Sequence, residues 1–217
     1  TDKQLIMKRT YSFIIALSML VTTSALAQDG ERVNVLISTD YGDMVAELYN
    51  ETPGHRDNFI KLTKEGWYEG SPFHRVIKNF MIQGGQNADG SVDPGYTIPA
   101  EFSNSFYHKK GALAAARMGD QVNPMKASSG CQFYIVQGKV VEEEMLMNMS
   151  KRSGFSYTDQ AIKDYTSIGG TPHLDGGYTV FGEIVSGLEV IDKIAAVQTG
   201  AKDVPVKEIK MKISIVK

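Results

Sequence analysis

The residues best able to do chemistry gather in one stretch, which runs from Phe73 to Gly85 and reads FHRVIKNFMIQGG. It contains a cation (Arg75), an aromatic ring (Phe80) and an amide (Gln83). Alternate side chains of a strand share a face, so Arg75 is expected to lie beside apolar neighbours. Two interpretations are open: an ordinary surface or ion-paired arginine, or a hydrogen-bond donor held over an apolar pocket.

Several common kinds of site do not match the sequence. Gly84-Gly85 lacks the Lys-Ser/Thr pair of a phosphate-binding loop. The four histidines have no spacing typical of a metal site, and Ser128 and Ser129 stand in no nucleophile motif. The single cysteine, Cys131, cannot form an internal disulfide and is expected to be a small buried hydrophobe rather than a catalytic thiol. What remains is a site of one arginine, amides, aromatic rings and small residues, with no nucleophile–base pair.

The elements that must position these residues read mostly as strands separated by turns. Apolar or alternating runs bounded by turn residues predict strands at 33–38, 43–49, 73–77, 80–83, 132–137, 178–184 and 206–216. One helix is expected from Thr52-Pro53, with threonine as N-cap and proline at the first helical position, to Gly66. A shorter helix is expected after Gly187, and the Gly-, Asp- and Pro-rich residues 84–96 predict a loop. Many strands with two peripheral helices indicate a closed barrel or a sandwich.

The run Gly111–Arg117 is made almost entirely of small side chains and has two interpretations. Alanine has the best helix propensity, which favours a helix. However, the run is short, begins with glycine and lies between strand-like segments. A strand of small side chains would let another chain approach closely, and we favour the strand.

Residues 140–170 break the strand pattern. They contain three consecutive glutamates, several methionines and the polar run Asp159–Tyr165, which reads as helical. We therefore expect a helical insertion at about 140–170, with methionines that serve packing rather than function.

Residues 1–27 are expected to comprise a secretory signal peptide and upstream residues, followed by one domain at 28–217. A basic start at Met7-Lys8-Arg9 precedes the apolar core Phe13–Val21 and the small–large–small cleavage pattern Ala25-Leu26-Ala27. The apolar core is shorter than the about 20 residues that span a membrane. Cleavage near Ala27, giving a periplasmic or secreted protein, is therefore favoured over an uncleaved membrane anchor.

The charge balance limits the partners of the chain. Its 217 residues carry a formal net charge of −2, and loss of the basic N-terminal segment makes the domain more acidic. A mildly acidic protein has no electrostatic case for binding nucleic acid. We expect no nucleic-acid partner, no membrane partner after signal cleavage, and a monomer.

The motifs together resemble the signature of the cyclophilins, the peptidyl-prolyl cis–trans isomerases. The resemblance rests on 73–85 and continues through Gly111–Arg117, 132–135 and 174–182, and it covers most of Val33–Lys217. It implies a mainly β fold, a closed eight-stranded antiparallel β-barrel capped by two α-helices. The segment at 140–170 exceeds the usual loop of the family, and the resemblance implies no cofactor.

The resemblance also implies roles for individual residues. Arg75 resembles the catalytic arginine of the family, and His173 and Tyr178 stand where members have tryptophan and histidine. Tyr134 replaces a usual phenylalanine, and Arg117 a usual asparagine whose backbone contacts the substrate. The implied substrate-binding residues are the proline-pocket set and the groups beside it: Phe80, Met81, Gln83, Ala116, Arg117, Gln132, Tyr134, His173, Leu174 and Tyr178.

The inventory of residues suits rotation about an X-Pro bond. Resonance opposes this rotation with a barrier of about 18–20 kcal/mol, but no bond is made or broken, so no nucleophile or general base is needed. A guanidinium that hydrogen-bonds the proline nitrogen stabilises the twisted transition state more than the planar ground state. We therefore expect a peptidyl-prolyl isomerase acting on proline-containing, unfolded or partly folded exported proteins. Two alternatives are a barrel that binds proline segments with little catalysis, and a hydrolase, which the missing nucleophile–base pair disfavours.

Overall fold

The computed structural model describes residues 30–90 and 93–216. The expected signal peptide at 1–27 lies outside the described residues. The large antiparallel sheet has the strand order β3-β11-β1-β2-β10-β7-β9-β5-β4. Its strands are β1 (Asn34–Thr39), β2 (Gly42–Leu48), β3 (Ser71–Pro72), β4 (Arg75–Ile77), β5 (Met81–Gly84), β7 (Ala112–Ala115), β9 (Phe133–Val136), β10 (Val180–Ser186) and β11 (Lys210–Val216). A small second sheet pairs β6 (Thr97–Ile98) with β8 (Ser128–Ser129).

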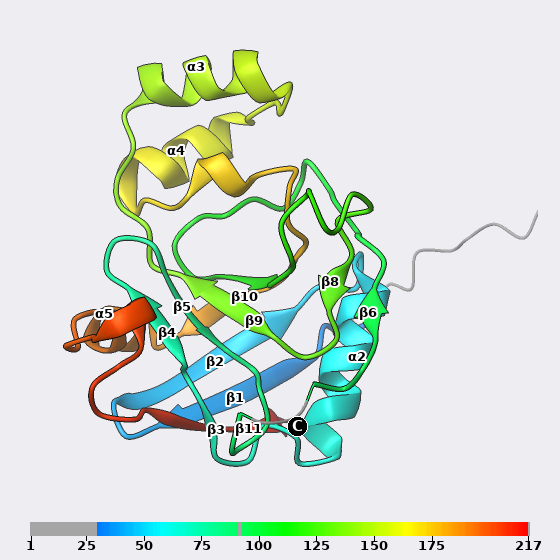
Figure 1. The fold of residues 1–217 in the computed structure, drawn as a ribbon. Coiled ribbons are helices and arrows are strands. Elements are labelled where there is room, and N and C mark those ends of the chain that lie inside the picture. The colour runs from blue at the N-terminus through cyan, green and yellow to red at the C-terminus, as the bar shows by residue number, and fades with distance from the viewer. Residues whose placement is uncertain (1–29, 91–92, 217) are drawn as a thin grey trace, which may run out of the picture.

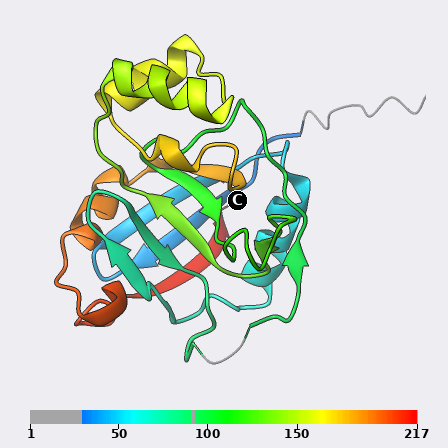
Figure 2. The same cartoon turned by 45° about the horizontal axis from the view of Figure 1, so that its top comes forward.

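Four α-helices accompany the sheet in the described part of the chain: α2 (Pro53–Lys64), α3 (Glu143–Ser153), α4 (Asp159–Ser167) and α5 (Leu188–Ala195). Helices α2 and α5 lie at opposite ends of the curled sheet, whereas α3 and α4 lie together beyond the end of β9 (Figures 1 and 2). Two short 3₁₀ turns, η1 (Pro172–Leu174) and η2 (Ala201–Asp203), complete the described elements.

The sheet is a strongly curled half-barrel, and the expected closed eight-stranded barrel with two helices is corrected accordingly. Its two edge strands, β3 and β4, belong to one stretch of chain and are separated only by Phe73 and His74. Strand β3 pairs with β11, and β4 pairs with β5. One short stretch thus crosses from one edge of the sheet to the other, so the gap is bridged by the covalent chain rather than by a ladder of hydrogen bonds.

Most expected elements are confirmed, with shifted ends. The first hairpin is β1 and β2, and the alanine-rich run is the strand β7, because it pairs on both sides, with β10 and β9. The closing strand begins at Lys210 rather than Val206. The segment 140–170 is helical, as expected, and forms α3 and α4.

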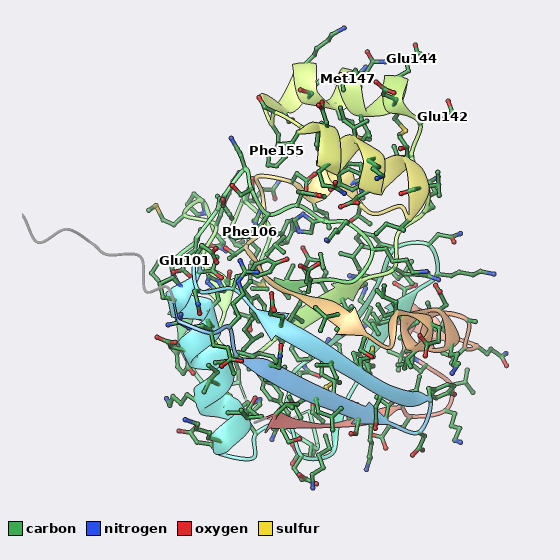
Figure 3. All side chains as sticks on the ribbon, turned by 180° about the vertical axis from the view of Figure 1, so that it is seen from behind. Glu101, Phe106, Glu142, Glu144, Met147 and Phe155 are labelled. Atoms are coloured by element: carbon green, nitrogen blue, oxygen red, sulfur yellow. The ribbon has the colours of Figure 1, made fainter. Side chains whose placement is uncertain are left out.

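The start of α2 is stabilised differently from the expectation. Thr52 is the N-cap, but its side chain makes no capping hydrogen bond. Instead, the carboxylate of Glu101 accepts hydrogen bonds from the backbone N–H groups of Gly54 and His55, both at 3.0 Å. Glu101 lies beside the N-terminal end of α2 (Figure 3). A carboxylate here satisfies free backbone donors and complements the positive end of the helix dipole.

The core fills the inside of the curled sheet. Inward-facing residues of β7 and β9, such as Leu113 and Ile135, are fully buried there with side chains of α2 and α5. The alternate residues of the same strands, such as Ala114 and Tyr134, face outward and form a second buried cluster. The two faces of β7 and β9 therefore belong to the core on one side and to the floor of the candidate site on the other.

Candidate active site

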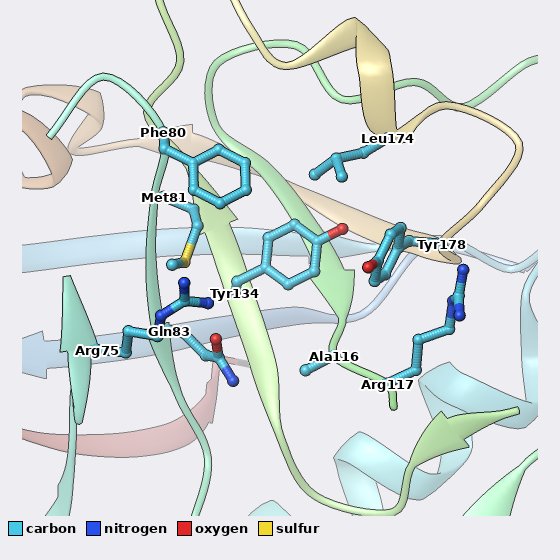
Figure 4. Close-up of a pocket in the computed structure, with 9 residues that line it drawn as sticks. All are labelled: Arg75, Phe80, Met81, Gln83, Ala116, Arg117, Tyr134, Leu174 and Tyr178. Atoms are coloured by element: carbon cyan, nitrogen blue, oxygen red, sulfur yellow. The ribbon is translucent and has the colours of Figure 1, made fainter. Parts of the chain in front are cut away.

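A pocket of about 170 Å³ opens over the outer face of β5, β7 and β9 (Figure 4). It is smaller than the roughly 300–1,000 Å³ typical of sites for drug-sized ligands, so it suits one small side chain. Strands β4, β5 and β9, the residues directly after β7 and the segment around η1 supply its lining. The lining residues are Arg75, Phe80, Met81, Gln83, Ala116, Arg117, Tyr134, Leu174 and Tyr178.

Arg75 is both ion-paired and placed at an apolar pocket, so both interpretations offered by the sequence apply. It lies on β4 directly opposite Gln83 of β5 and lines the pocket. It is also ion-paired, because its Nε donates to Oδ2 of Asp203 at 3.3 Å. The Arg75 side chain is 43% exposed. With Nε engaged by Asp203, the terminal guanidinium nitrogens are the donors nearest the pocket.

The apolar floor is made of Phe80, Met81, Leu174 and the ring of Tyr134. Met81 and Tyr134 are buried. The hydroxyl of Tyr134 lies 2.9 Å from Nε2 of His108, so it is engaged by a neighbour behind the pocket. Burial raises the pKa of Tyr134 well above its usual value, so the hydroxyl stays neutral.

The polar side of the pocket is formed by amides. Nε2 of Gln83 donates to Oε1 of Gln132 at 3.2 Å. Gln132 itself lies outside the pocket lining and, with Gln83, Ala116 and Arg117, borders a neighbouring groove of about 420 Å³. Of the expected substrate-binding residues, Gln132 is therefore placed to orient Gln83 rather than to touch a ligand in the pocket.

Arg117, which follows β7, is held both by the segment after η1 and by its own loop. Its Nε donates to the carbonyl of Gly177 at 2.7 Å, and its Nη1 donates to Asp120 at 2.6 Å. The guanidinium carbon stacks 4.4 Å above the ring of Tyr178. The side chain thus builds one wall of the pocket, which adds to the backbone role expected of this position.

Two expected contacts are placed less directly than the sequence indicated. The backbone N–H of Ala116 donates to Gln132 and its carbonyl accepts from Ser129. A substrate contact at Ala116 must therefore use the second lone pair of that carbonyl. His173 is exposed and stacks on Phe80 at a centroid distance of 5.6 Å, outside the pocket lining.

Sequence reasoning missed two polar groups behind the pocket, His108 and Asp175. Nδ1 of His108 lies 2.7 Å from Oδ1 of Asp175, and both side chains are 1% exposed. The signal available in the sequence was the position of Asp175 next to the pocket residue Leu174. Nothing local indicated His108, which is far from Asp175 along the chain and meets it only in the fold.

A second buried histidine, His55, contacts Ser128, a pairing that the sequence did not indicate. Nε2 of His55 lies 2.9 Å from Oγ of Ser128, and its Nδ1 lies 2.6 Å from Oε2 of Glu101. Ser128 and His55 are 1% and 2% exposed, so no substrate reaches the serine. The arrangement ties α2 to the small sheet. Cys131 is buried as expected, and burial raises the pKa of its thiol to about 11.

Within residues 30–90 and 93–216, no group of three or more histidine, cysteine or carboxylate side chains is arranged to hold a metal ion. Among the helices of the same residues, none has the length and apolar character needed to cross a membrane.

Comparison with protein families identifies one model, described as cyclophilin type peptidyl-prolyl cis-trans isomerase/CLD, which matches residues 34–215. A Staphylococcus epidermidis protein described as a peptidyl-prolyl cis-trans isomerase is 36% identical over 187 residues, which cover 84% of this chain and 90% of that protein. A bifunctional phosphatase/peptidyl-prolyl cis-trans isomerase of Streptococcus pyogenes is 38% identical over 185 residues, 81% of this chain. The chain spans only 37% of that longer relative.

Solved structures agree with this similarity. A Cryptosporidium parvum cyclophilin-type peptidyl-prolyl cis-trans isomerase superposes with a TM-score of 0.65 at 25% identity, covering 86% of this chain and 99% of that one. A second crystal structure of the same protein, determined in the presence of the dipeptide Ala-Pro, gives a TM-score of 0.64 and covers 85% of this chain.

Proposed function

Because the chain belongs to the cyclophilin-type peptidyl-prolyl cis–trans isomerase family and is an isomerase of that type, we propose that Arg75 is its catalytic residue and that the adjoining pocket holds the substrate proline. The observation that carries this proposal is the position of the Arg75 guanidinium at the edge of an apolar pocket lined by Phe80, Met81 and Tyr134. The determination of a Cryptosporidium parvum relative's crystal structure in the presence of the dipeptide Ala-Pro supports a proline-containing ligand.

The proposed mechanism is differential binding of a twisted amide. As the X-Pro bond rotates, resonance is lost and the proline nitrogen becomes pyramidal and basic. The guanidinium of Arg75 donates to this nitrogen, which accepts poorly in the planar ground state. One such donor in a water-poor site contributes about 3–4 kcal/mol, or roughly two to three decades in rate. Arginine suits the role because it stays charged in partly buried positions.

The other residues are proposed to hold the substrate. The floor formed by Met81, Phe80 and Tyr134 packs on the proline ring, and Gln83, oriented by Gln132, donates to the main chain of the substrate. The small side chain of Ala116 lets that main chain lie close to β7. His173, which packs on Phe80, supports the rim of the pocket rather than its floor.

We propose that the substrates are exported proteins that fold in the periplasm or outside the cell, and that the enzyme is a monomer there. Support comes from the sequence alone: a basic start, an apolar core and the Ala25-Leu26-Ala27 cleavage pattern. The segment containing α3 and α4 is proposed to be an addition to the usual fold of the family. Expression of the full chain in a Gram-negative host should yield periplasmic protein whose N-terminus is Gln28. Recovery only from the cytoplasm, with an uncut N-terminus, would contradict export.

The catalytic proposal is tested by measuring isomerisation of a short X-Pro peptide and, separately, its affinity. Arg75→Ala should lower kcat about a hundredfold or more and change peptide affinity much less, because the donor acts mainly in the transition state. Arg75→Lys is the matched control, since it keeps the charge but loses the planar fork. An equal loss of turnover and affinity in Arg75→Ala would refute the role given to Arg75.

A further inference from the structure

The hydroxyl of the pocket residue Tyr134 is the first member of a buried chain of polar contacts. It lies 2.9 Å from Nε2 of His108, and the two rings are nearly parallel, at an interplanar angle of 11°. Nδ1 of His108 lies 2.7 Å from Oδ1 of Asp175, which also accepts the backbone N–H of His108 at 2.8 Å. The imidazole is therefore fixed at both nitrogens and at its own backbone.

The chain of contacts continues into the helical segment. The second carboxylate oxygen of Asp175, Oδ2, accepts the hydroxyl of Tyr165 at 2.6 Å. Tyr165 lies on α4, is fully buried, and packs with Leu146 of α3 and with Val141. Asp175 directly follows Leu174, which lines the pocket. The hydroxyl of Tyr165 thus connects α4 to the carboxylate behind the pocket, and Tyr157, between α3 and α4, also interacts with Asp175.

Because these side chains are buried, each of their polar groups needs a hydrogen-bond partner within the protein. The four side chains of Tyr134, His108, Asp175 and Tyr165 have almost no exposed surface. A buried polar group left without a partner is strongly unfavourable, so each hydroxyl and each oxygen is held in its hydrogen bond. If the Tyr134 hydroxyl lost His108, it would become a buried polar group without its partner at the floor of the pocket, which is unfavourable.

We propose that Tyr165 is a positioning residue for the proline pocket, acting through Asp175 and His108 on the ring of Tyr134, and that this is the role of the α3–α4 segment. The inference rests on the proposed function of the pocket. A phenylalanine at 134 would need no such support, because it has no hydroxyl to satisfy. The tyrosine at 134 and the helical segment are therefore linked, because the segment supplies the last hydrogen bond of the chain that holds the Tyr134 hydroxyl.

The test compares two tyrosine hydroxyls that α4 holds. Tyr165→Phe removes the hydroxyl that reaches Asp175 and keeps the packing of the ring. Tyr107→Phe is the matched control, because its hydroxyl donates to Asp164 of α4 at 2.6 Å rather than to Asp175, and the change keeps the ring that packs on Tyr165. We expect Tyr165→Phe to weaken binding of a short Ala-Pro peptide at least threefold with little change in kcat, and Tyr107→Phe to leave affinity unchanged.

The route through Tyr134 is tested in a second background. Tyr134→Phe lacks the hydroxyl that His108, Asp175 and Tyr165 hold in place. In this background, Tyr165→Phe should have no further effect on peptide affinity. The ¹⁵N NMR signals of the His108 ring should shift in Tyr165→Phe and not in Tyr107→Phe. If Tyr165→Phe does not fold, Asp175→Asn, which keeps one oxygen for His108, takes its place.

The outcomes separate the inference from the function on which it rests. Equal affinities in Tyr165→Phe and Tyr107→Phe, or an undiminished effect of Tyr165→Phe in the Tyr134→Phe background, would overturn the positioning role. If Tyr134→Ala binds the peptide as well as the unchanged chain does, the proline pocket itself has been misplaced. Loss of affinity in Tyr134→Ala without any effect of Tyr165→Phe would reject the positioning role alone.

Discussion

At the scale of single residues, Arg75 depends on its neighbour Asp203. Asp203 lies on the 3₁₀ turn η2, where Lys202 and Asp203 both have positive φ angles, 59° and 61°. Such backbone is uncommon outside glycine and persists where the surrounding structure fixes it. The turn brings a carboxylate to the Nε of Arg75, so one donor is occupied and the remaining donors of the fork keep their direction.

We expect Asp203→Asn to lower kcat about two- to fivefold and to leave KM nearly unchanged, because a less oriented guanidinium meets the proline nitrogen less often. The expected change in kcat is small because the Arg75 and Asp203 side chains are 43% and 44% exposed. An ion pair this exposed contributes at most about 1 kcal/mol. Steady-state kinetics on an X-Pro peptide measures both constants. Asp192→Asn is the control, since Asp192 is 45% exposed, pairs with Lys110 and makes no contact with Arg75 or the pocket lining. Equal kinetics in the two variants would show that Asp203 does not orient Arg75.

At the scale of elements, the local sequence pattern predicts most helices and strands, whereas contacts between distant residues decide how they pair. The hairpin of β1 and β2 and the strand β9 follow from apolar runs between turn residues, and the structure confirms them. Residues within Gly111–Arg117 form a strand despite the high helix propensity of alanine. Hydrogen bonds to β10 and β9 on both sides stabilise the extended backbone there. A helical segment was also predictable at 140–170, since its polar and methionine-rich pattern fits no strand.

What the sequence could not supply are the contacts between distant residues. The carboxylate that caps α2 comes from Glu101, and nothing around Thr52 indicates it. The open edge at β3 and β4 is likewise a property of the whole sheet, which local periodicity does not encode. The sequence of a single strand does not determine whether the sheet closes into a barrel. Closure depends on whether the two edge strands pair with each other.

The candidate site divides in the same way. The lining residues could be grouped in advance only through the resemblance of their motifs to those of the cyclophilins, because strand alternation relates neighbours within one strand and not residues of different strands. Their gathering around one pocket is now a structural fact, while their individual roles stay predictions. The partners behind the lining, His108 for Tyr134 and Asp203 for Arg75, could not be foreseen, because each pair joins residues separated by a long stretch of chain.

At the scale of the whole molecule, the pocket and the core are two sides of the same strands. On β9, Phe133 and Ile135 belong to the core, and Tyr134 and Val136 belong to the outer cluster beneath the pocket. Helices α2 and α5 lie at opposite ends of the curled sheet, and α3 and α4 lie beyond the end of β9, next to the segment of η1 (Figure 1). A change in packing within the core therefore moves the backbone that carries the floor of the pocket, because close-packed interiors transmit strain.

One buried and one partly buried histidine, His55 and His74, give the fold a dependence on pH. Burial lowers the pKa of His55, against the opposing effect of Glu101, and it also lowers the pKa of His74 next to Arg75. In the unfolded chain these groups titrate at about 6.5. Below that pH the unfolded state binds protons that the folded state resists, so the free energy of unfolding falls as the pH drops. Above it, both states are neutral at these sites and the effect vanishes.

We therefore expect urea unfolding midpoints to be constant from about pH 8 to 7 and to fall from about pH 6.5 to 5.5, before most carboxylates take up protons. The slope cannot exceed about 1.4 kcal/mol per pH unit for each histidine. His74→Gln, which cannot bind a proton in this range, should flatten the slope, and His173→Gln should flatten it as well, because burial also lowers the pKa of His173. A free energy of unfolding that rises on acidification across this window would mean that the pairing of His55 with Glu101 outweighs its burial.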